Sequence, residues 1–253
     1  MNLSKNKIKY IQSLKDKKYR NEYKTFVAEG NKMVSELLYS MNCQLLIATK
    51  EFLNSIDLSS TKIEEIIEVA DSDISKASFL KNPQQVLAVF YQPQYKLDNS
   101  KIKNKLSLAL DGIQDPGNLG TIVRLADWYG IEDIICSEDT ADIFNPKTVQ
   151  ATMGAIARIK IHYVKLADFL SQANDIPIYG TLLDGECMYE KQLSKNGIIV
   201  MGNEGNGIRP EIQNLLTDKL YIPNYPPDRE TSESLNVAIA TAIICAEFRR
   251  RAF

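Results

Sequence analysis

Hydrophobic residues along the chain alternate between short apolar runs and stretches with a helical period. The runs at residues 106–110, 133–136, 159–164, 178–182, 197–201 and 219–222 have the length of buried strands. Between them, residues 119–129, 146–152, 166–173, 211–216 and 235–249 repeat their apolar positions as amphipathic helices do. Strands that alternate with helices predict a mostly parallel sheet covered on both faces, so we expect an α/β fold here.

A smaller α/β unit precedes this region. Strands are expected at residues 26–30, 45–48, 68–70 and 86–90, and helices at residues 5–14, 33–38 and 62–67. Between residues 92 and 105 the chain is polar and contains few apolar side chains, which is typical of a linker. We therefore predict one domain at residues 1–95, a linker at 96–105 and a second domain at 106–253.

Charge limits the kinds of partner that the chain can bind. Its 253 residues carry a net charge of −2, which excludes a uniformly basic nucleic-acid binder and leaves only a local basic patch. Residues 1–33 contain nine basic and three acidic residues, among them Lys15, Lys17, Lys18 and Arg20. On charge alone a solubilising face is the simpler interpretation of this patch, and RNA binding is the alternative.

The cysteine and histidine content argues against a metal site. The four cysteines include no C-x-x-C pair and His162 is the one histidine, so we expect no bound metal. Cys136 and Cys245 lie in apolar runs and are expected in the core. His162 lies on the polar side of an alternating pattern, which predicts a surface position and removes the usual general base. Without a signal peptide or a membrane-length apolar segment, a cytoplasmic location without a membrane partner is expected.

Polar motifs follow the strands of the second domain. The first motif, residues 111–124, runs from a strand through an Asp-Pro-Gly turn into a helix that we expect to begin at Asn118. In this helix the period places Arg124 off the apolar face. Because parallel strands bind ligands at their carboxyl ends, this motif predicts a ligand site.

Two further motifs occupy equivalent positions. The loop Gly202-Asn203-Glu204-Gly205 follows a strand and lacks the glycine spacing of dinucleotide-binding and phosphate-binding loops. The stretch Ser234-Leu235-Asn236-Val237 opens the last helix, for which Ser234 is a suitable N-cap. That helix is apolar nearly all round, which indicates burial in the core or against a second subunit.

Together these motifs resemble the three signature motifs of the SpoU/TrmH family of RNA 2′-O-ribose methyltransferases, in the SPOUT superfamily. The similarity covers residues 106–253. The first domain resembles the family's L30e-like RNA-binding domain through Arg20 and residues 26–30. Two features depart from the family pattern, namely the long glycine-free segment 224–233 and Gln85, where many relatives have glycine.

The resemblance implies a trefoil knot in the second domain, a homodimer packed through helices that include the last one, and S-adenosylmethionine as cofactor. It assigns catalysis to Arg124, Asn118, Glu204, Ser234 and Asn236. We expect Arg124 to orient the ribose and stabilise charge on its oxygen, and Glu204 to hold Arg124 or receive the proton. The implied cofactor contacts are Thr181, Leu182, Gly202, Asn203, Gly205, Ile222, Pro223 and Leu235.

The implied substrate is RNA, and the lysine-rich region with Lys15, Lys17, Lys18 and Arg20 becomes the expected RNA-binding surface. Ribosomal RNA is preferred because the first domain resembles that of relatives acting on large-subunit RNA, and transfer RNA is the alternative. A non-catalytic RNA-binding dimer also stays open, as does an α/β nucleotide-dependent hydrolase, although the chain has no phosphate loop for the latter. The sequence does not identify the modified nucleotide.

Overall fold

The computed structural model describes residues 3–173, 175–226, 229 and 234–251. Contacts within the chain divide it into two units. The first contains Met1–Gln94 and Asp142–Ala157, and the second contains Tyr95–Ala141 and Arg158–Phe253. The segment Asp142–Ala157 therefore packs within the first unit although its sequence lies between two strands of the second.

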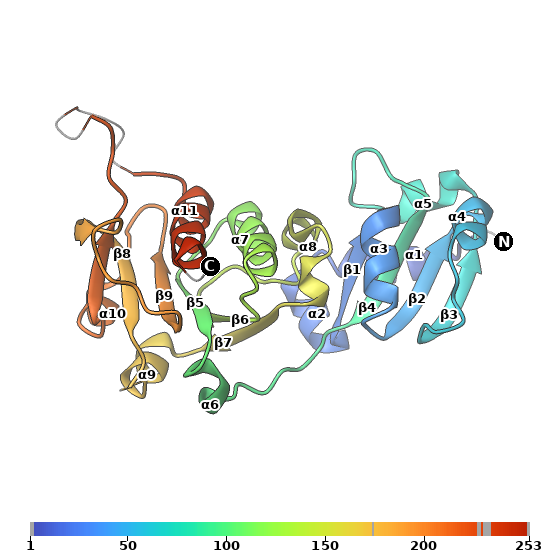
Figure 1. Cartoon of the computed structure of the whole chain (residues 1–253). Helices are drawn as coiled ribbons and strands as arrows, with labels where there is room; N and C mark the ends of the chain where they lie inside the picture. The colour runs from blue at the N-terminus through green and yellow to red at the C-terminus, as the bar shows by residue number, and fades with distance from the viewer. Residues whose placement is uncertain (1–2, 174, 227–228, 230–233, 252–253) are drawn as a thin grey trace. The chain divides into compact units, whose positions relative to one another are not determined.

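A six-stranded parallel sheet lies at the centre of the second unit (Figure 1). Its strand order is β10-β8-β9-β5-β6-β7, and every neighbouring pair is parallel. The strands are β5 (Leu106–Asp111), β6 (Asp133–Ser137), β7 (Lys160–Val164), β8 (Ile178–Cys187), β9 (Gly197–Gly202) and β10 (Asp218–Tyr221). The six apolar runs correspond to these six strands, so the predicted α/β fold is confirmed.

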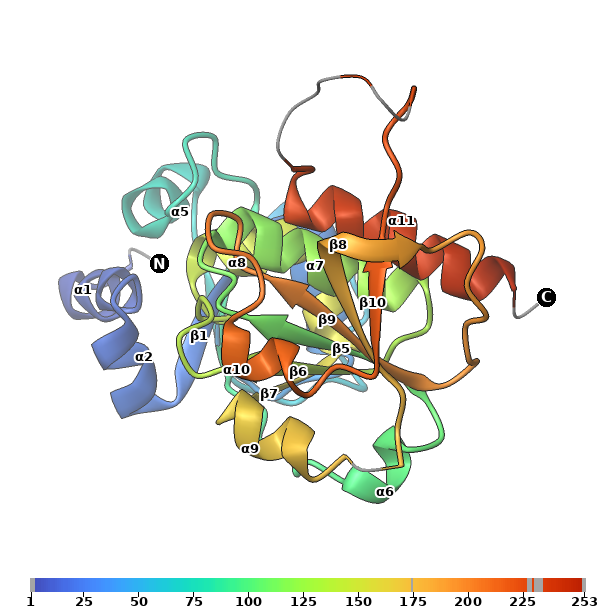
Figure 2. The same ribbon diagram turned by 90° about the vertical axis from the view of Figure 1, so that its left-hand side faces the viewer.

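Helices cover both faces of this sheet (Figure 2). Helices α7 and α11 lie over one face, and α6, α9 and α10 lie over the other. Side chains from the latter group, such as Phe169 and Ile212, share a hydrophobic cluster with Ala109 and Val200 of the strands. The helices are α6 (Asn99–Ile102), α7 (Pro116–Trp128), α9 (Leu166–Ser171), α10 (Pro210–Gln213) and α11 (Val237–Arg250).

The first unit contains a four-stranded mixed sheet of order β1-β4-β2-β3. Strands β1 and β2 are antiparallel to β4, whereas β3 is parallel to β2. The strands are β1 (Thr25–Glu29), β2 (Cys43–Ala48), β3 (Ile63–Glu68) and β4 (Val86–Tyr91). The helix predicted at residues 62–67 is wrong, because these residues form β3. Their β-branched isoleucines suit a strand, and pairing with β2 overrides the helical spacing.

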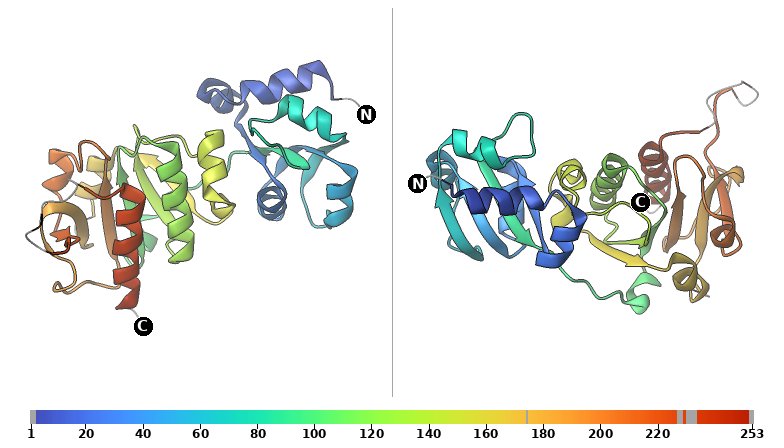
Figure 3. Two further views of the ribbon diagram at one scale, coloured as in Figure 1. Left: turned by 90° about the horizontal axis from the view of Figure 1, so that it is seen from above. Right: turned by 180° about the vertical axis from the view of Figure 1, so that it is seen from behind.

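Helix α1 lies over one face of this sheet (Figure 3), where Ile11 joins Val27 and Leu87 in a hydrophobic cluster. Helix α8 packs against β1, and the ring centroids of Phe26 and Phe144 are 4.9 Å apart. The helices of this unit are α1 (Lys5–Ser13), α2 (Lys17–Tyr23), α3 (Asn31–Leu38), α4 (Lys50–Ser55), α5 (Asp71–Ala77) and α8 (Pro146–Thr152), with a 3₁₀ turn at Ala155–Ala157.

Burial tests two expectations about single residues. Cys136 and Cys245 are buried, so their predicted place in the core is confirmed, and burial raises the pKa of the Cys245 thiol to about 12. The predicted surface position of His162 is wrong, because its side chain is 5% exposed and its Nε2 lies 2.9 Å from Asp133 Oδ1. The ring of Tyr95, from the segment before the first strand, packs edge-on against His162.

In the described part of the chain, no helix has both the length and the apolar character needed to cross a membrane.

Candidate active site

A chain of side-chain hydrogen bonds joins the three polar motifs of the second unit. Asn236 Nδ2 donates to Asn118 Oδ1 at 3.0 Å, and Asn118 Nδ2 donates to Glu204 Oε1 at 2.8 Å. The motifs of Asn118 and Glu204 follow β5 and β9, which are neighbours in the sheet. Because neighbouring parallel strands end at the same edge, the loops that follow them meet there, as the strand pattern predicts.

Asp115 rather than Asn118 begins helix α7. Asp115 Oδ1 accepts the backbone N–H of Asn118 at 2.7 Å, and Pro116 occupies the first helical position. The predicted helix start at Asn118 is therefore wrong by three residues. Since Asp115 caps the helix, the Asn118 side chain is not needed as a cap and extends to the other two motifs.

Asn236 begins helix α11. Its Oδ1 accepts the backbone N–H groups of Ala238 and Ile239 at 3.0 and 3.3 Å. Ser234, predicted to be the N-cap, is exposed and lies two residues earlier. One amide group thus caps the helix with its oxygen and contacts Asn118 with its nitrogen.

Asn203 holds the glycine loop after β9 in shape. Its backbone exchanges two hydrogen bonds with Gly207, both 2.9 Å long, and its Oδ1 accepts the N–H of Gly205 at 2.9 Å. Its Nδ2 donates to the carbonyl oxygen of Gly112, in the first motif, at 2.6 Å. A Cβ on Gly202 would lie 2.3 Å from the Gly207 carbonyl carbon, so only glycine fits there. The Asn203 side chain therefore ties two of the motifs together.

A buried carboxylate supports this edge of the sheet. Asp111, the last residue of β5, has a fully buried side chain, and its two oxygens accept the backbone N–H and the Nε–H of Arg209 at 2.8 and 2.7 Å. The hydrogen bonds to Asp111 raise the pKa of the Arg209 guanidinium. The sequence pattern does not predict this ion pair, because its two residues are 98 positions apart. The available signal was Asp111 itself, because an acidic residue at the end of a buried strand needs a partner for its charge.

Arg124 lies on the exposed side of α7, as its helical position predicts. Glu204 takes Asn118 as its partner, so the expected contact between Glu204 and Arg124 is not made among the described residues. In the same part of the chain, the Arg124 guanidinium has no hydrogen bond or ion pair. Its charge is therefore available to an anionic ligand.

Two family models match separate parts of the chain. A model of the SpoU rRNA methylase family matches residues 105–246, and a model of the MRM3-like substrate-binding domain matches residues 5–88. The chain belongs to the SpoU rRNA methylase family. The family resemblance and an N-terminal substrate-binding domain are thus confirmed, whereas the trefoil knot stays a prediction.

Relatives of the SpoU family match both units. The 23S rRNA (guanosine(2553)-2′-O)-methyltransferase RlmP of Bacillus subtilis is 31% identical over 96% of each chain. A solved structure of a TrmH-family protein from Porphyromonas gingivalis is 42% identical, with a TM-score of 0.89 over 99% of this chain and 100% of that one. The AdoMet-bound rRNA methyltransferase from Sinorhizobium meliloti is 30% identical, with a TM-score of 0.83 over 100% and 97%.

Apart from Leu235, which lies just before α11, the expected cofactor contacts of this SpoU chain lie on or beside β8, β9 and β10, which are neighbours in the sheet. Thr181 Oγ1 donates to the Val200 carbonyl oxygen at 3.3 Å, where β8 separates from β9. Leu235 is 49% exposed. The other members are Leu182 in β8, Gly202 at the end of β9, Asn203 and Gly205 in the loop, and Ile222 and Pro223 after β10. Residues 227–228 and 230–233 of the glycine-free segment lie outside the described residues.

Gly205 gives a steric test of this cofactor site. Among the described residues, a Cβ placed on Gly205 would meet only Asn203 Oδ1, at the ordinary contact distance of 3.6 Å. The chain itself therefore does not require glycine at this position, unlike Gly202. A small residue here leaves the backbone open to a ligand, so the loop fits a cofactor that approaches it closely.

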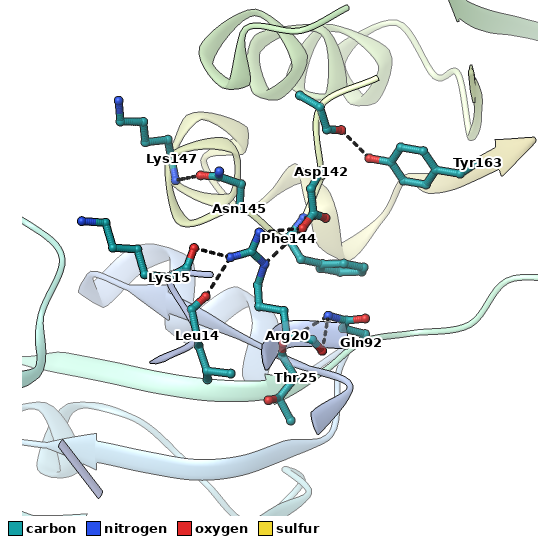
Figure 4. Close-up of polar contacts among 11 residues, drawn as sticks. Leu14, Lys15, Arg20, Thr25, Gln92, Asp142, Phe144, Asn145, Lys147 and Tyr163 are labelled. Atoms are coloured by element: carbon teal, nitrogen blue, oxygen red, sulfur yellow. Dashed lines mark hydrogen bonds and ion pairs between the residues drawn. The ribbon is translucent and has the colours of Figure 1, made fainter. Parts of the chain in front are cut away.

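In the substrate-binding unit, the structure separates the predicted RNA contacts into two kinds. Lys15, Lys17 and Lys18 are exposed, whereas Arg20 is 1% exposed. The Arg20 guanidinium donates to two main-chain carbonyl oxygens at 2.8 and 2.6 Å and pairs with Asp142 at 2.7 Å (Figure 4). The predicted RNA contact of Arg20 is at odds with this burial, because its donors are used within the unit. RNA binding by Lys15, Lys17 and Lys18 stays a prediction.

Proposed function

We propose that this chain transfers a methyl group from S-adenosylmethionine to a ribose 2′-hydroxyl of 23S ribosomal RNA. The observation that carries the proposal is the hydrogen-bonded chain Asn236–Asn118–Glu204, which unites the three motifs in the unit that also exposes Arg124. Support comes from RlmP, a 23S rRNA (guanosine(2553)-2′-O)-methyltransferase to which the chain is similar over both units. The AdoMet-bound Sinorhizobium meliloti relative supports the cofactor.

When bound, S-adenosylmethionine supplies an electrophilic methyl group on a sulfonium centre. Thr181, where β8 separates from β9, would hold it with Gly202 and Gly205 at the end of β9 and Ile222 after β10. The exposed apolar side chain of Leu235 would also contact it. The open side of Gly205 supports this assignment.

The protein's own contribution to methyl transfer is positioning and activation of the hydroxyl. A guanidinium is a cation that donates hydrogen bonds and accepts none, so we assign Arg124 to binding phosphate and stabilising charge that develops on the ribose oxygen. Glu204 uses only Oε1 in the described contacts, and we assign its second oxygen to accept the hydroxyl proton. Asn118 and Asn236 orient Glu204, and Ser234 contacts the substrate near the start of α11.

We further propose a homodimer packed through α11 and neighbouring helices. Helix α11 packs against α7, and apolar side chains of both helices remain exposed: Ile239 is 53% and Trp128 is 82% exposed. Apolar exposure of this extent is a common sign of an interface. The mass of the chain in solution, measured by light scattering, tests this part of the proposal.

Calorimetry with S-adenosylmethionine and methyl transfer from labelled cofactor test the function. Unmodified 23S rRNA and total tRNA are offered separately, and the labelled position is mapped by the resistance of its phosphodiester to alkaline cleavage. We expect cofactor binding and labelling of 23S rRNA. Labelling of tRNA alone would overturn the assignment to rRNA, and RNA binding without cofactor binding would indicate a non-catalytic relative.

A further inference from the structure

A pocket of about 340 Å³ lies in the first unit, between β1, α8 and the segment that follows α5. All of its lining residues belong to this unit. Its apolar walls come from Val27, Phe79, Leu80, Val149 and Met153. Its volume is at the lower end of the range of small-ligand sites, roughly 300–1,000 Å³.

Glu29 contributes a buried carboxylate to this pocket. It is the last residue of β1 and is 5% exposed. Its Oε1 accepts the N–H of Phe79 at 2.9 Å, and its Oε2 accepts the hydroxyl of Ser78. Burial raises the pKa of this carboxyl group, and among the described residues no cation lies within ion-pair distance of it.

The remaining hydrogen-bonding capacity of Glu29 points to a ligand. Each carboxylate oxygen has two lone pairs, so one acceptor position per oxygen is left after the bonds to Ser78 and Phe79. A buried carboxylate is normally compensated by donors or a cation, because its desolvation is costly. A ligand with two adjacent donors would supply that compensation.

Lys147 adds the opposite charge to the same pocket. It lies on α8, is exposed, and its ammonium group has no ion pair within the described ranges. Figure 4 shows its side chain extending away from Arg20. The pocket therefore combines apolar walls with one buried acceptor group and one exposed cation. An occupant that matches it has a flat apolar body, a donor edge and a separate anionic group.

We propose that this pocket binds one unstacked guanine nucleotide of the RNA substrate, with the base edge at Glu29 and the phosphate at Lys147. Guanine presents a ring N–H and an amino group side by side, and the other three RNA bases have no such pair of adjacent donors. Proteins recognise single-stranded RNA by stacking unstacked bases on aromatic side chains and bonding to their edges, for which Phe79 is suited. This inference rests on the proposed RNA methyltransferase function.

Saturation-transfer NMR on the full chain tests the pocket with guanosine, adenosine, cytidine and uridine 5′-monophosphates. We expect the guanine nucleotide to bind most tightly. Glu29→Gln should weaken binding of the guanine nucleotide about tenfold or more. The charge-assisted bonds are lost, and the glutamine NH₂ group would face the N–H donors of the base. Lys147→Ala should weaken the monophosphate several-fold and leave guanosine unaffected. Lys50→Ala, which removes an exposed lysine outside the pocket, should change neither.

A second variant guards against misfolding of Glu29→Gln. Met153 is 48% exposed, so Met153→Trp should fill the pocket from its rim and abolish nucleotide binding. Equal binding of the four nucleotides, or none, would overturn the proposal. A stronger response to N-acetylargininamide than to the guanine nucleotide would also overturn it, since the pocket would then suit a protein side chain.

Cofactor calorimetry and methyl transfer, measured on the same preparation, separate this inference from the proposed function. Methyl transfer without preference for the guanine nucleotide would overturn the pocket assignment alone. Guanine-selective binding that depends on Glu29, in a chain that binds no cofactor, would overturn the enzyme assignment and support the pocket.

Discussion

The side-chain amide of Asn236 donates to Asn118 Oδ1 at 3.0 Å, across 118 positions of sequence. The cap of α11 fixes the direction of this bond, because Asn236 Oδ1 faces the helix N–H groups and only Nδ2 is left for Asn118. Asn118 must then present its oxygen to Asn236 and its nitrogen to Glu204. A helix cap thus determines how the carboxylate of the proposed site is held.

Asn236→Asp separates the two tasks of this residue. Aspartate caps helices as well as asparagine does, so the stability of the chain should be retained. The donor to Asn118 is lost, and we expect methyl transfer to slow about tenfold, in line with the loss of one side-chain hydrogen bond. Asn236→Ala should in addition lose about 1 kcal/mol of stability. Initial rates and thermal unfolding measure the two effects, and a fully active Asn236→Asp would contradict this role.

Asn118→Ala tests whether the two asparagines act as one unit. We expect a slower reaction with little loss of stability, because Asp115 keeps the α7 cap. In a double-mutant cycle, the rate effects of Asn118→Ala and Asn236→Asp should be less than additive. Additive effects would show that the hydrogen bond between them does not serve catalysis.

Arg124→Ala should lower the rate of methyl transfer at least about a hundredfold, the usual cost of removing a group that stabilises developing charge. Cofactor affinity, measured by calorimetry, should stay within about twofold of the original, because Arg124 is placed toward the RNA. Lys165→Ala, which removes another exposed cation of the second unit, is the matched control and should react normally. Full activity of Arg124→Ala would remove the proposed mechanism.

Replacing Lys15, Lys17 and Lys18 together by alanine should weaken RNA binding and flatten its salt dependence. Each phosphate contact contributes about 0.7 to the logarithmic salt slope for single strands, so the slope should fall by roughly 2. Fluorescence anisotropy over a range of salt concentrations measures it. Lys50→Ala combined with Lys62→Ala, at exposed positions of the same unit, is the control. An unchanged slope would show that the three lysines do not contact RNA and instead keep the chain soluble.

Arg209→Met should destabilise the second unit by about 2–3 kcal/mol, because it leaves the buried Asp111 carboxylate without its guanidinium. The backbone N–H of Arg209 still reaches Asp111, which limits the loss. Removing the charge of both partners, in Asp111→Asn with Arg209→Met, should cost less than Arg209→Met alone. Urea unfolding distinguishes the two variants, and equal stability of Arg209→Met and the parent chain would refute the importance of the pair.

Glu247 predicts an acid-sensitive contribution to stability. Hydrogen bonds from Arg250, and then Arg251, lower the pKa of this carboxyl group from 4.5 to about 2. Such a group stabilises the folded chain above its unfolded pKa, and the stabilisation is lost as the pH falls from about 4.5 toward 2. Because Arg250 is largely exposed, we expect a contribution on the order of 1 kcal/mol. The difference in unfolding free energy between the parent and Glu247→Gln should therefore shrink across that interval.

The sequence by itself determined the strands of the second unit and the three motifs that meet in the candidate site. The central strands β5, β6 and β9 are buried along almost their whole length, and such strands need continuous apolar runs that a pattern reveals. The position of Asn118, Glu204 and Asn236 beside strand ends and a helix start was likewise predicted. Their hydrogen bonds were not, because a contact between distant segments depends on the path of the whole chain.

Tertiary structure alone decided several local questions. Residues 62–67 have a spacing that suits a helix, yet pairing with β2 makes them a strand. His162 alternates as a surface residue would, yet Asp133 and Tyr95 enclose it. Arg20 looks like an RNA contact in sequence, whereas Asp142 takes its guanidinium in the fold.

Helix α8 shows most clearly which features the sequence determines and which the tertiary structure decides. Its sequence predicts a helix with an apolar side at residues 146–152, and in the fold Asn145 caps this helix by accepting the backbone N–H of Lys147. Its neighbours in sequence belong to the second unit, yet it packs against β1 of the first and forms a wall of the Glu29 pocket. The hydrophobic effect requires that an apolar face be covered but has no direction, so only the folded chain decides which sheet covers it.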